Sequence, residues 1–452
     1  MTGRRQLGPS LRCCEFDVVV SLMGRLLFFF SLVPFLTLQA ARPNIVMIMA
    51  DDFGYECVSA NGGTSYETPE LDKMATEGMR FEHCYSQPIC TPSRVKLMTG
   101  MANIRNYVKF GLLDPKQTTF AQLLKREGYA TCVVGKWQLE LKGGFEGPNQ
   151  AGFDEYALWQ LTRRPSRYPN GGLEINGKEV NYTQGEYLPD IVSDYACDFI
   201  DRNQKNPFLL YYPMILTHCP FEPTPDSKDW DPKSPGSETY KGDAHYFGDM
   251  VGYMDKLIGK ILRKLEDAGL RENTLVIFVG DNGTDTPVES MLDGRQVAGA
   301  KGKMPDGGNR VPFIASWPGT IPAGNVSQEI VDFSDFLPTF CEATETKIPE
   351  GIDGRSMLKT LKGSTEKHRN WIYMWYSRNG GNKAAKQFTR NPRYKLYGNG
   401  KYYDIQEDVL EKSPLDIAGL NEDQKTTYEM LQSALVGYQD KRPAHLGLPE
   451  KK

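Results

Sequence analysis

The chain has no marked excess of charge of either sign. Its 452 residues include 53 lysines and arginines and 57 aspartates and glutamates, so the formal net charge is −4. A basic patch is the usual mark of a nucleic-acid-binding protein, and this sequence has neither such a patch nor an acidic tail. We therefore expect no nucleic acid among its partners. The length allows a large core and predicts two or three domains.

Cysteine is scarce and irregularly spaced. In a chain of this size, scattered cysteines do not indicate a small scaffold stapled by disulfides, and no Cys-x-x-Cys pair indicates zinc. Outside the cytoplasm, an odd number of cysteines leaves at least one without an intramolecular partner, and Cys90 is the natural candidate. The cysteines beyond residue 40 are Cys57, Cys84, Cys90, Cys132, Cys197, Cys219 and Cys341.

The sequence also lacks an apolar run that would span a membrane comfortably. Its most apolar stretch, Leu26–Ala40, is short, contains a proline and follows Arg25. A basic residue, a short apolar region and a small residue at the expected cleavage point are the features of a secretory signal. We predict a signal peptide at residues 1–40 and an exported protein, with a single membrane anchor as the alternative. Met23 is a second candidate start, which would make residues 1–22 a mis-called extension.

Four apolar runs predict central strands of a sheet, and each leads to polar residues. Continuous apolar character is typical of strands covered on both faces. Helical patterns at residues 119–127, 191–202 and 246–268 lie between the runs. This alternation predicts an α/β fold with a large, mostly parallel central sheet flanked by helices. The runs are Ile45–Ala50 before Asp51 and Asp52, Ala130–Val134 before Gly135 and Lys136, Phe208–Tyr212 leading to Thr217 and His218, and Thr274–Val279 before Gly280, Asp281 and Asn282.

The polar residues that follow these runs are predicted to converge. In a parallel sheet, the ligand crevice lies at the carboxyl ends of the strands. Taken singly, each residue also has a purely structural interpretation, because Asp-Asp and Asp-Asn-Gly form turns and a lone histidine is usually a hydrogen-bonded loop residue. Their common position at the strand ends favours a functional site. They are Asp51, Asp52, Lys136, His218, Asp281 and Asn282.

Four members of this set offer oxygen ligands to a metal ion. Asp51, Asp52 and Asp281 supply carboxylates and Asn282 supplies an amide oxygen. Such hard donors suit Ca²⁺, with Mg²⁺ as the second choice. Zinc would instead prefer nitrogen or sulfur ligands.

Cys90 lies just before a predicted helix. Thr91 is the expected N-cap, Pro92 the expected first helical residue, and Arg94 lies one turn further on. Unpaired backbone N–H groups at a helix N-terminus favour an anion, and the planar guanidinium of Arg94 suits an oxyanion. The alternative for a single cysteine is a small buried hydrophobe.

Three loops carry further cations. The glycine-rich segment Gly299–Pro312 could bring Lys301 close to a ligand, although a solvated loop lysine is the ordinary interpretation. The segments Arg163–Tyr168 and Ser377–Asn382 contain arginines among polar or aromatic residues. They could contact an acidic sugar, or they could be solvated surface loops.

After about residue 365 the pattern changes to short strand-like runs separated by asparagine and glycine. These runs predict a small antiparallel sheet, and Glu422–Asp440 predicts a helix capped by Asn421. We therefore divide the chain into an α/β domain at residues 41–365 and a C-terminal subdomain of antiparallel sheet plus helix at residues 366–452. The strand-like runs are 371–376, 394–397 and 401–405.

The motifs taken in order resemble the type I sulfatases, the formylglycine-dependent family of the alkaline phosphatase superfamily. Cys90–Arg94 matches the family signature Cys-x-Pro-Ser-Arg, whose cysteine is oxidised to formylglycine. The similarity covers roughly residues 42–362 and extends more loosely into the C-terminal part. The other matching motifs are Asp51-Asp52, Gly135-Lys136-Trp137, Thr217-His218, Gly280–Gly283, Lys301 with Gly307-Gly308, and Gly351–Gly354.

This resemblance implies a role for each residue of the site. Formylglycine at Cys90, together with the four oxygen ligands, would bind Ca²⁺, and one hydroxyl of the hydrated aldehyde would attack the sulfate sulfur. Arg94 would stabilise that hydroxyl as an alkoxide. Lys136, Lys301 and His218 would hold the sulfate oxygens, and His218 or Lys301 would protonate the departing alcohol.

Two positions depart from the family pattern. Gln138 stands where the family usually has a histidine, the expected base for sulfate expulsion, and Asp306 replaces a usual glutamate. Because the metal set, Cys90 and both lysines are intact, the resemblance implies an active, arylsulfatase-like hydrolase. Its expected partners are a sulfated carbohydrate and, during maturation, the formylglycine-generating enzyme. The alternatives are a phosphodiesterase or phosphonate monoester hydrolase with the same nucleophile, and a non-catalytic protein that binds sulfated glycans.

Overall fold

The computed structural model describes residues 42–139 and 146–446. The predicted signal peptide at residues 1–40 lies outside these ranges. Within them, no helix combines the length and the apolar character needed to cross a membrane. The seven cysteines from Cys57 to Cys341 are all buried, and none forms a disulfide.

A mixed ten-stranded sheet organises the chain, in the order β12-β2-β11-β8-β1-β7-β3-β4-β5-β6. The central strand β1 is parallel to both neighbours, with Val46 opposite Leu210 in β7 and opposite Val276 in β8. The predicted α/β fold is confirmed, and the sheet is mixed because β11, β5 and β6 join by antiparallel pairing. The strands are β1 (Asn44–Ala50), β2 (Met79–Tyr85), β3 (Ala130–Lys136), β4 (Glu155–Trp159), β5 (Gly172–Ile175), β6 (Lys178–Asn181), β7 (Phe208–Pro213), β8 (Thr274–Gly280), β11 (Phe313–Ser316) and β12 (Asn325–Asp332).

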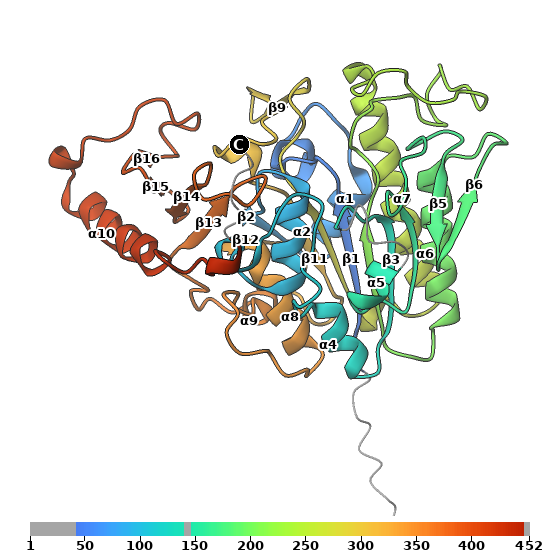
Figure 1. Cartoon of the computed structure of the whole chain (residues 1–452), viewed down its shortest axis with the longest axis horizontal. Coiled ribbons are helices and arrows are strands. Elements are labelled where there is room, and N and C mark those ends of the chain that lie inside the picture. Colours follow the sequence, from blue (N-terminus) through green and yellow to red (C-terminus); the bar gives the residue numbers. More distant parts are fainter. Residues whose placement is uncertain (1–41, 140–145, 447–452) are drawn as a thin grey trace, which may run out of the picture. The chain divides into compact units, whose positions relative to one another are not determined.

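Helices cover both faces of this sheet (Figure 1). Successive side chains of a strand point to opposite faces, so Met47 belongs to one buried cluster and Val46 to the other. On the Met47 side lie α2 (Cys90–Thr99), α4 (Phe120–Arg126) and α8 (Phe336–Ala343). On the Val46 side lie α1 (Pro69–Thr76), α6 (Leu188–Arg202) and α7 (Phe247–Asp267).

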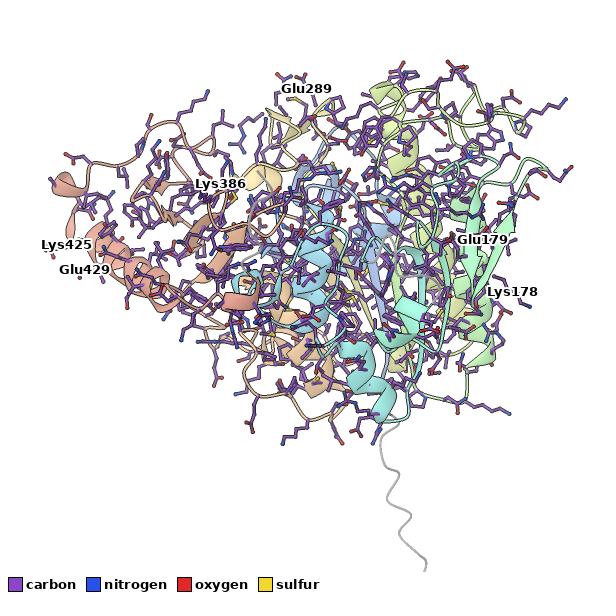
Figure 2. All side chains as sticks on the ribbon, in the orientation of Figure 1. Lys178, Glu179, Glu289, Lys386, Lys425 and Glu429 are labelled. Carbon is purple, nitrogen blue, oxygen red and sulfur yellow. The ribbon has the colours of Figure 1, made fainter. Side chains whose placement is uncertain are left out.

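Exposed charges mark the outer edge of the sheet. Lys178 and Glu179 project from β6, the last strand in the order (Figure 2). Charged side chains on an edge strand discourage pairing with a second chain. Shorter elements complete the α/β part: α3 (Asn103–Asn106), α5 (Gly147–Gln150), α9 (Leu358–Leu361), and the hairpin of β9 (Glu289–Leu292) and β10 (Arg295–Ala298).

The predicted C-terminal sheet and helix are confirmed. Strands β13 (Ile372–Tyr376), β14 (Lys386–Arg390), β15 (Tyr394–Tyr397) and β16 (Tyr402–Asp404) form an antiparallel sheet, and α10 (Glu422–Gly437) packs on β14 and β15. Asn421 caps α10 by accepting from the backbone N–H of Gln424, as predicted. Leu431 is fully buried against this sheet, whereas Lys425 and Glu429 project from the outer face of α10 (Figure 2). The boundary at residue 365 stays a prediction.

Candidate functional site

The predicted polar residues gather where the central strands end. Asp51 and Asp52 directly follow β1, Lys136 is the last residue of β3, and Asp281 with Asn282 follows β8. Two glycines allow this crowding. A Cβ at Gly135 would lie 2.1 Å from a backbone oxygen of Pro213, and a Cβ at Gly280 would lie 1.9 Å from that of Phe53. A side chain at either position would therefore clash with the neighbouring backbone.

The helix that carries Cys90 starts two residues earlier than predicted, so the prediction that Thr91 is its N-cap is wrong. Ile89 holds the N-cap position with extended backbone angles, and Cys90 is the first residue of α2. Thr91 cannot cap because its hydroxyl is engaged elsewhere: it donates to the carbonyl of Gln138 at 3.4 Å and accepts from the N–H of Gly111 at 3.2 Å. Cys90 still lies at a helix N-terminus, and it is only 2 % exposed.

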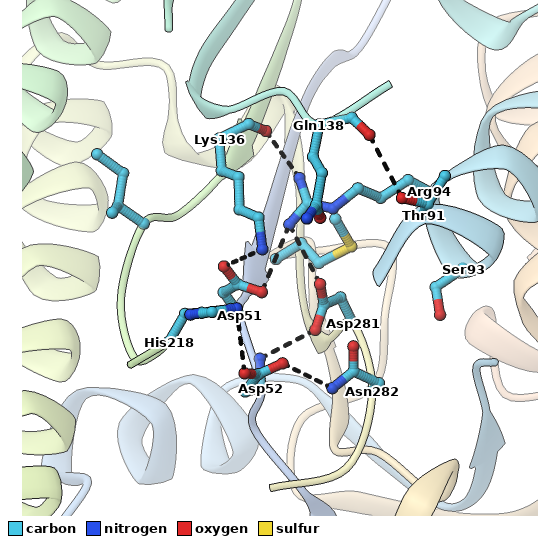
Figure 3. Close-up of polar contacts among 12 residues, drawn as sticks. Asp51, Asp52, Thr91, Ser93, Arg94, Lys136, Gln138, His218, Asp281 and Asn282 are labelled. Atoms are coloured by element: carbon cyan, nitrogen blue, oxygen red, sulfur yellow. Dashed lines mark hydrogen bonds and ion pairs between the residues drawn. The ribbon is translucent and has the colours of Figure 1, made fainter. Parts of the chain in front are cut away.

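Three ion pairs hold the acidic residues of the site, and Figure 3 shows those of Lys136 and Arg94. Lys136 Nζ lies 2.6 Å from Asp51 Oδ2, and Lys301 Nζ lies 2.5 Å from Asp52 Oδ2. The third cation, Arg94, lies 3.2 Å from Asp281 Oδ2 and also donates to the Lys136 carbonyl at 2.7 Å. Because buried charges are stable only when paired, these contacts fix the three carboxylates relative to α2.

Asp52 connects the loops that follow β1 and β8. Its backbone N–H donates to Asp281 Oδ1 at 3.0 Å, and its Oδ1 accepts from Asn282 Nδ2 at 2.8 Å. Asp52 adopts a left-handed backbone conformation with φ of 58°. Non-glycine residues in this region concentrate at functional sites, where surrounding contacts hold them.

His218 joins the site from the loop after β7. Its Nε2 lies 3.2 Å from Lys301 Nζ and 3.6 Å from Asp52 Oδ2. Nδ1 contacts the carbonyl of Cys219, which can only accept, so Nδ1 carries the hydrogen and Nε2 is the acceptor. Burial, together with the cations Arg167 and Lys301, holds the pKa of His218 well below its ordinary value. Lys301 therefore donates its proton toward a neutral imidazole.

Burial is the largest single influence on the pKa values of the acidic groups at the site. Burial and the Asp51 carboxylate raise the pKa of Asp281, and burial raises that of Asp52 despite the nearby Lys301. Burial alone would raise the pKa of Asp51 as well, but Lys136 lowers it below its ordinary value. Burial also raises the pKa of the Cys90 thiol, although lysines of the site oppose this. Like-charged carboxylates at such short range favour an added cation.

The residues present fit a divalent cation. Asp51 Oδ1 and Asn282 Oδ1 are buried and have no hydrogen-bond partner. Such oxygens are costly unless they bind something. Ligand atoms of Asp51, Asp52 and His218 lie within 4.8 Å of one another. The donors are mainly oxygen, which favours a hard ion, and His218 adds a nitrogen that the predicted ligand set did not include.

A cavity of about 560 Å³ opens beside the site. His218 and Gln138 line it, so the cavity adjoins the predicted catalytic residues. Several other lining residues were not identified from the sequence, because they come from distant loops without a motif. The two arginine-containing loops were the sequence feature that pointed to this cavity, since Arg164, Arg167 and Arg378 all line it. The remaining lining residues include Phe110, Trp159, Gln160, Glu222 and Tyr240.

Comparisons with known proteins agree on one family. The family model described as sulfatase matches residues 43–346, and a model described as N-sulphoglucosamine sulphohydrolase, C-terminal, matches residues 300–439. N-acetylgalactosamine-6-sulfatase of Canis lupus familiaris is 32% identical over 378 residues, covering 73% of this chain and 68% of that protein. Arylsulfatase G of Mus musculus is 30% identical over 431 residues, covering 82% and 79%.

A solved structure is similar over most of the chain. The crystal structure of Ps i-CgsB has a TM-score of 0.74 and 26% sequence identity, and the match covers 89% of this chain and 94% of that one. Ps i-CgsB has also been solved in complex with k-i-k-neocarrahexaose, with a TM-score of 0.73 to this chain.

Proposed function

Because the chain belongs to the formylglycine-dependent sulfatases of the alkaline phosphatase superfamily, we propose that it is exported and releases sulfate from a sulfated carbohydrate. Sulfate-ester hydrolysis is the activity of this family. The carbohydrate, the export and the use of formylglycine by this chain are the proposed parts. They rest on the residues at the carboxyl edge of the sheet and on the leader-like sequence at residues 25–40.

One observation carries the proposal: the Cys-x-Pro-Ser-Arg segment opens a helix directly beside paired cations and carboxylates. Cys90 lies at the N-terminus of α2, where backbone N–H groups favour an anion. Ser93 folds back and accepts from the N–H of Gln87 at 3.0 Å, which fixes the segment leading into the helix. A nucleophile made from Cys90 would therefore be presented in a fixed position beside Arg94.

We assign the metal to Asp51, Asp52, Asp281, Asn282 and residue 90. A bound Ca²⁺ would neutralise the crowded carboxylates and withdraw charge from oxygens that contact it. The hydrated aldehyde of formylglycine would supply the hydroxyl that attacks sulfur. Arg94 would stabilise the negative charge on that hydroxyl. It is preset for this, because Asp281 and the Lys136 carbonyl hold its guanidinium.

The remaining cations are assigned to the sulfate and to the leaving group. Lys136 and Lys301 would each turn an ammonium hydrogen toward a sulfate oxygen, which stabilises the charge that grows in the transition state. Lys301 already donates toward His218 Nε2. This contact supports a proton path in which Lys301 and His218 together supply the hydrogen that the departing alcohol oxygen needs.

Release of sulfate from residue 90 is the step for which the chain lacks the family's usual base. Gln138 occupies that position, and its amide Oε1 is buried without a hydrogen-bond partner. An amide cannot take a proton at neutral pH. We infer that sulfate release is the slow half of the reaction, with water or a carboxylate accepting the proton.

A carbohydrate is the substrate that the surroundings support best. One relative is named for a sulfated N-acetylgalactosamine, and Ps i-CgsB was solved with an oligosaccharide. The cavity of about 560 Å³ beside His218 has room for a sugar unit and is open to solvent on one side, which suits a fragment of a polymer.

The test begins with the tryptic peptide Phe81–Arg94 from full-length protein made in a host with the formylglycine-generating enzyme. We expect the mass of formylglycine or its hydrate at residue 90, and release of sulfate from 4-nitrophenyl sulfate and from sulfated saccharides. Cys90→Ala, made in parallel, should bind the same saccharides without turnover. An unmodified cysteine in this peptide, with a known sulfatase converted in the same cells, would overturn the proposal. Faster turnover of a phosphodiester than of every sulfate ester would instead assign the chain to phosphodiester chemistry.

A further inference from the structure

The cavity beside the site contains more positive charge than one sulfate group requires. The lysines assigned to the sulfate, Lys136 and Lys301, do not line it. Three arginines do, and they come from two segments far apart in the sequence: Arg164 and Arg167 from the loop after β4, and Arg378 from the loop after β13. The two carboxylates of the lining, Glu222 and Glu238, do not balance them.

Arg167 is the strongest single observation. It is 8 % exposed, and its Nε and Nη1 have no hydrogen-bond partner. Its guanidinium is stacked over the ring of Trp159, with 4.1 Å from Cζ to the ring centroid, and Nη1 lies 3.8 Å from Asp51 Oδ2. A buried guanidinium with unused donors is costly unless a ligand accepts from it. Arg167 therefore places a positive charge between the Asp51 carboxylate and the cavity.

The other two arginines are exposed but held in place. The guanidinium of Arg378 lies 4.7 Å from the ring centroid of Phe110, and its backbone carbonyl accepts from the hydroxyl of Tyr107 at 2.8 Å. The amide oxygen of Gln160 accepts from Arg164 Nη2 and Nε at 3.2 and 3.1 Å in its hydrogen-bonding orientation. Preorganised guanidinium groups lose less entropy when they bind.

In the described part of the chain, the acidic residues of the lining do not form ion pairs that would neutralise the three arginines. Glu222 is 7 % exposed and accepts from the backbone N–H of Ser237, while its Oε2 has no partner. No ion pair joins Glu222 or Glu238 to any of the three arginines among the contacts of the described residues. The free oxygen of Glu222 can accept from a sugar hydroxyl, which suits a saccharide that also carries an anion.

We propose that this cavity binds a second oxyanion of the substrate, a carboxylate or a further sulfate on the same saccharide, through Arg164, Arg167 and Arg378. The inference rests on the proposed function, because the scissile sulfate is assigned to the neighbouring lysines. Planar guanidinium groups match carboxylate and sulfate equally well, so both sources share this chemistry. Trp159 and Phe110 each contact one of these arginines through the ring and thereby orient it.

Matched saccharide pairs test the proposal without requiring turnover. In full-length Cys90→Ala protein, calorimetry would measure Kd for three pairs: a sulfated disaccharide with its uronate free or as the methyl ester, a hexosamine with one or two sulfates, and a neutral pair differing in one hydroxyl. We expect the free carboxylate or the second sulfate to tighten binding roughly 10- to 100-fold, the range of one or two charge-assisted hydrogen bonds. The neutral pair should differ little.

Variants identify the cations responsible. Arg164→Gln and Arg378→Gln, each combined with Cys90→Ala, should remove most of the preference within each charged pair, while their Tm and their Kd for the neutral pair stay near those of Cys90→Ala alone. Lys109→Gln is the matched control, since Lys109 is exposed, precedes Phe110 and does not line the cavity. Equal Kd values within both charged pairs, or an equal loss in Lys109→Gln, would overturn the proposal. Absence of 4-nitrophenyl sulfate turnover by the protein that carries formylglycine at residue 90 would instead contradict the sulfatase assignment and leave the binding result standing.

Discussion

At the scale of single residues, Gln138 is the position that we expect to limit the reaction most directly. It lines the cavity beside the site, lies in a left-handed conformation with φ of 53°, and receives a hydrogen bond from Thr91 only at its backbone carbonyl. We predict that Gln138→His raises kcat for 4-nitrophenyl sulfate by roughly 10-fold or more, because an imidazole can accept the proton that sulfate release requires. Steady-state kinetics and the size of a pre-steady-state burst would measure this.

The control for this prediction is Gln138→Asn, which keeps an amide and should not accelerate release. A burst of product in the parent that disappears in Gln138→His would locate the change at sulfate release. If Gln138→His turns over no faster than Gln138→Asn, another group already serves as the base, and the inferred slow step is wrong.

His83 should make stability depend on pH at the same scale. Burial, followed by the nearby Arg310 and Arg390, lowers its pKa to about 4, and its Nδ1 has no hydrogen-bond partner. As pH falls below 6.5, His83 becomes protonated in the unfolded chain but stays neutral in the folded chain. The free energy of unfolding should therefore decrease until about pH 4. The loss should reach about 3 kcal/mol. Urea unfolding of His83→Gln between pH 7.5 and 4 should show a shallower decline, and parallel curves for both proteins would contradict the assignment.

At the scale of elements, Asp306 ties the glycine-rich loop to the C-terminal sheet. Its carboxylate lies 2.5 Å from Arg390 Nη1 of β14 and 3.6 Å from Lys395 Nζ of β15, and both cations are fully buried. Burial alone would raise the pKa of Asp306, but Arg390 holds it far below its ordinary value. Lys301 belongs to the same loop, so this contact also helps to position the lysine to which we assign a catalytic role.

We predict that Asp306→Asn lowers the free energy of unfolding by about 3 kcal/mol, because it leaves buried cations without their charged partner. It should also lower kcat, since the loop that carries Lys301 loses its anchor. Asp306→Glu, the residue that the resembled family usually carries here, keeps the charge and serves as the control. Denaturant unfolding and 4-nitrophenyl sulfate kinetics would measure both effects. Equal stability of the Asn and Glu variants would show that the ion pair contributes little.

At the scale of the whole molecule, the sequence predicted the parts that local pattern determines. The strands β1, β3, β7 and β8 are continuous apolar runs, so both they and the polar residues at their ends could be located in advance. β2 was not predicted, because Arg80, Glu82 and His83 interrupt its apolar residues and it is therefore not a continuous apolar run. Thr91 was wrongly predicted to be the N-cap of α2. The capping preference of threonine is a local property, and it takes no account of the hydrogen bond that Thr91 makes to distant Gln138.

The cavity beside the site shows why the remainder of the site could not be predicted. Its walls come from segments around residues 110, 160, 238 and 378, which no spacing rule connects. The stacking of Arg167 on Trp159 depends on how the loop after β4 folds back, and that is decided by tertiary packing. Motifs located the residues that we assign to the sulfate, and the two arginine loops gave a weaker signal for the cavity wall. The other residues of the wall become visible only in three dimensions.

The charge balance of the centre predicts how the whole molecule responds to a divalent cation. Asp51, Asp52 and Asp281 are fully buried together, and burial raises the pKa of Asp281. A cation that binds only the folded state should stabilise it by about 2.7 kcal/mol at a 100-fold excess over Kd. We therefore expect Ca²⁺, and to a smaller extent Mg²⁺, to raise Tm by a few degrees over the protein in EDTA. Asp281→Asn should remove most of this increment. Asp285→Asn, which breaks the ion pair with Lys241 outside the ligand set, should lower Tm but keep the increment. A Tm that is identical in EDTA and in Ca²⁺ would exclude the assigned metal site.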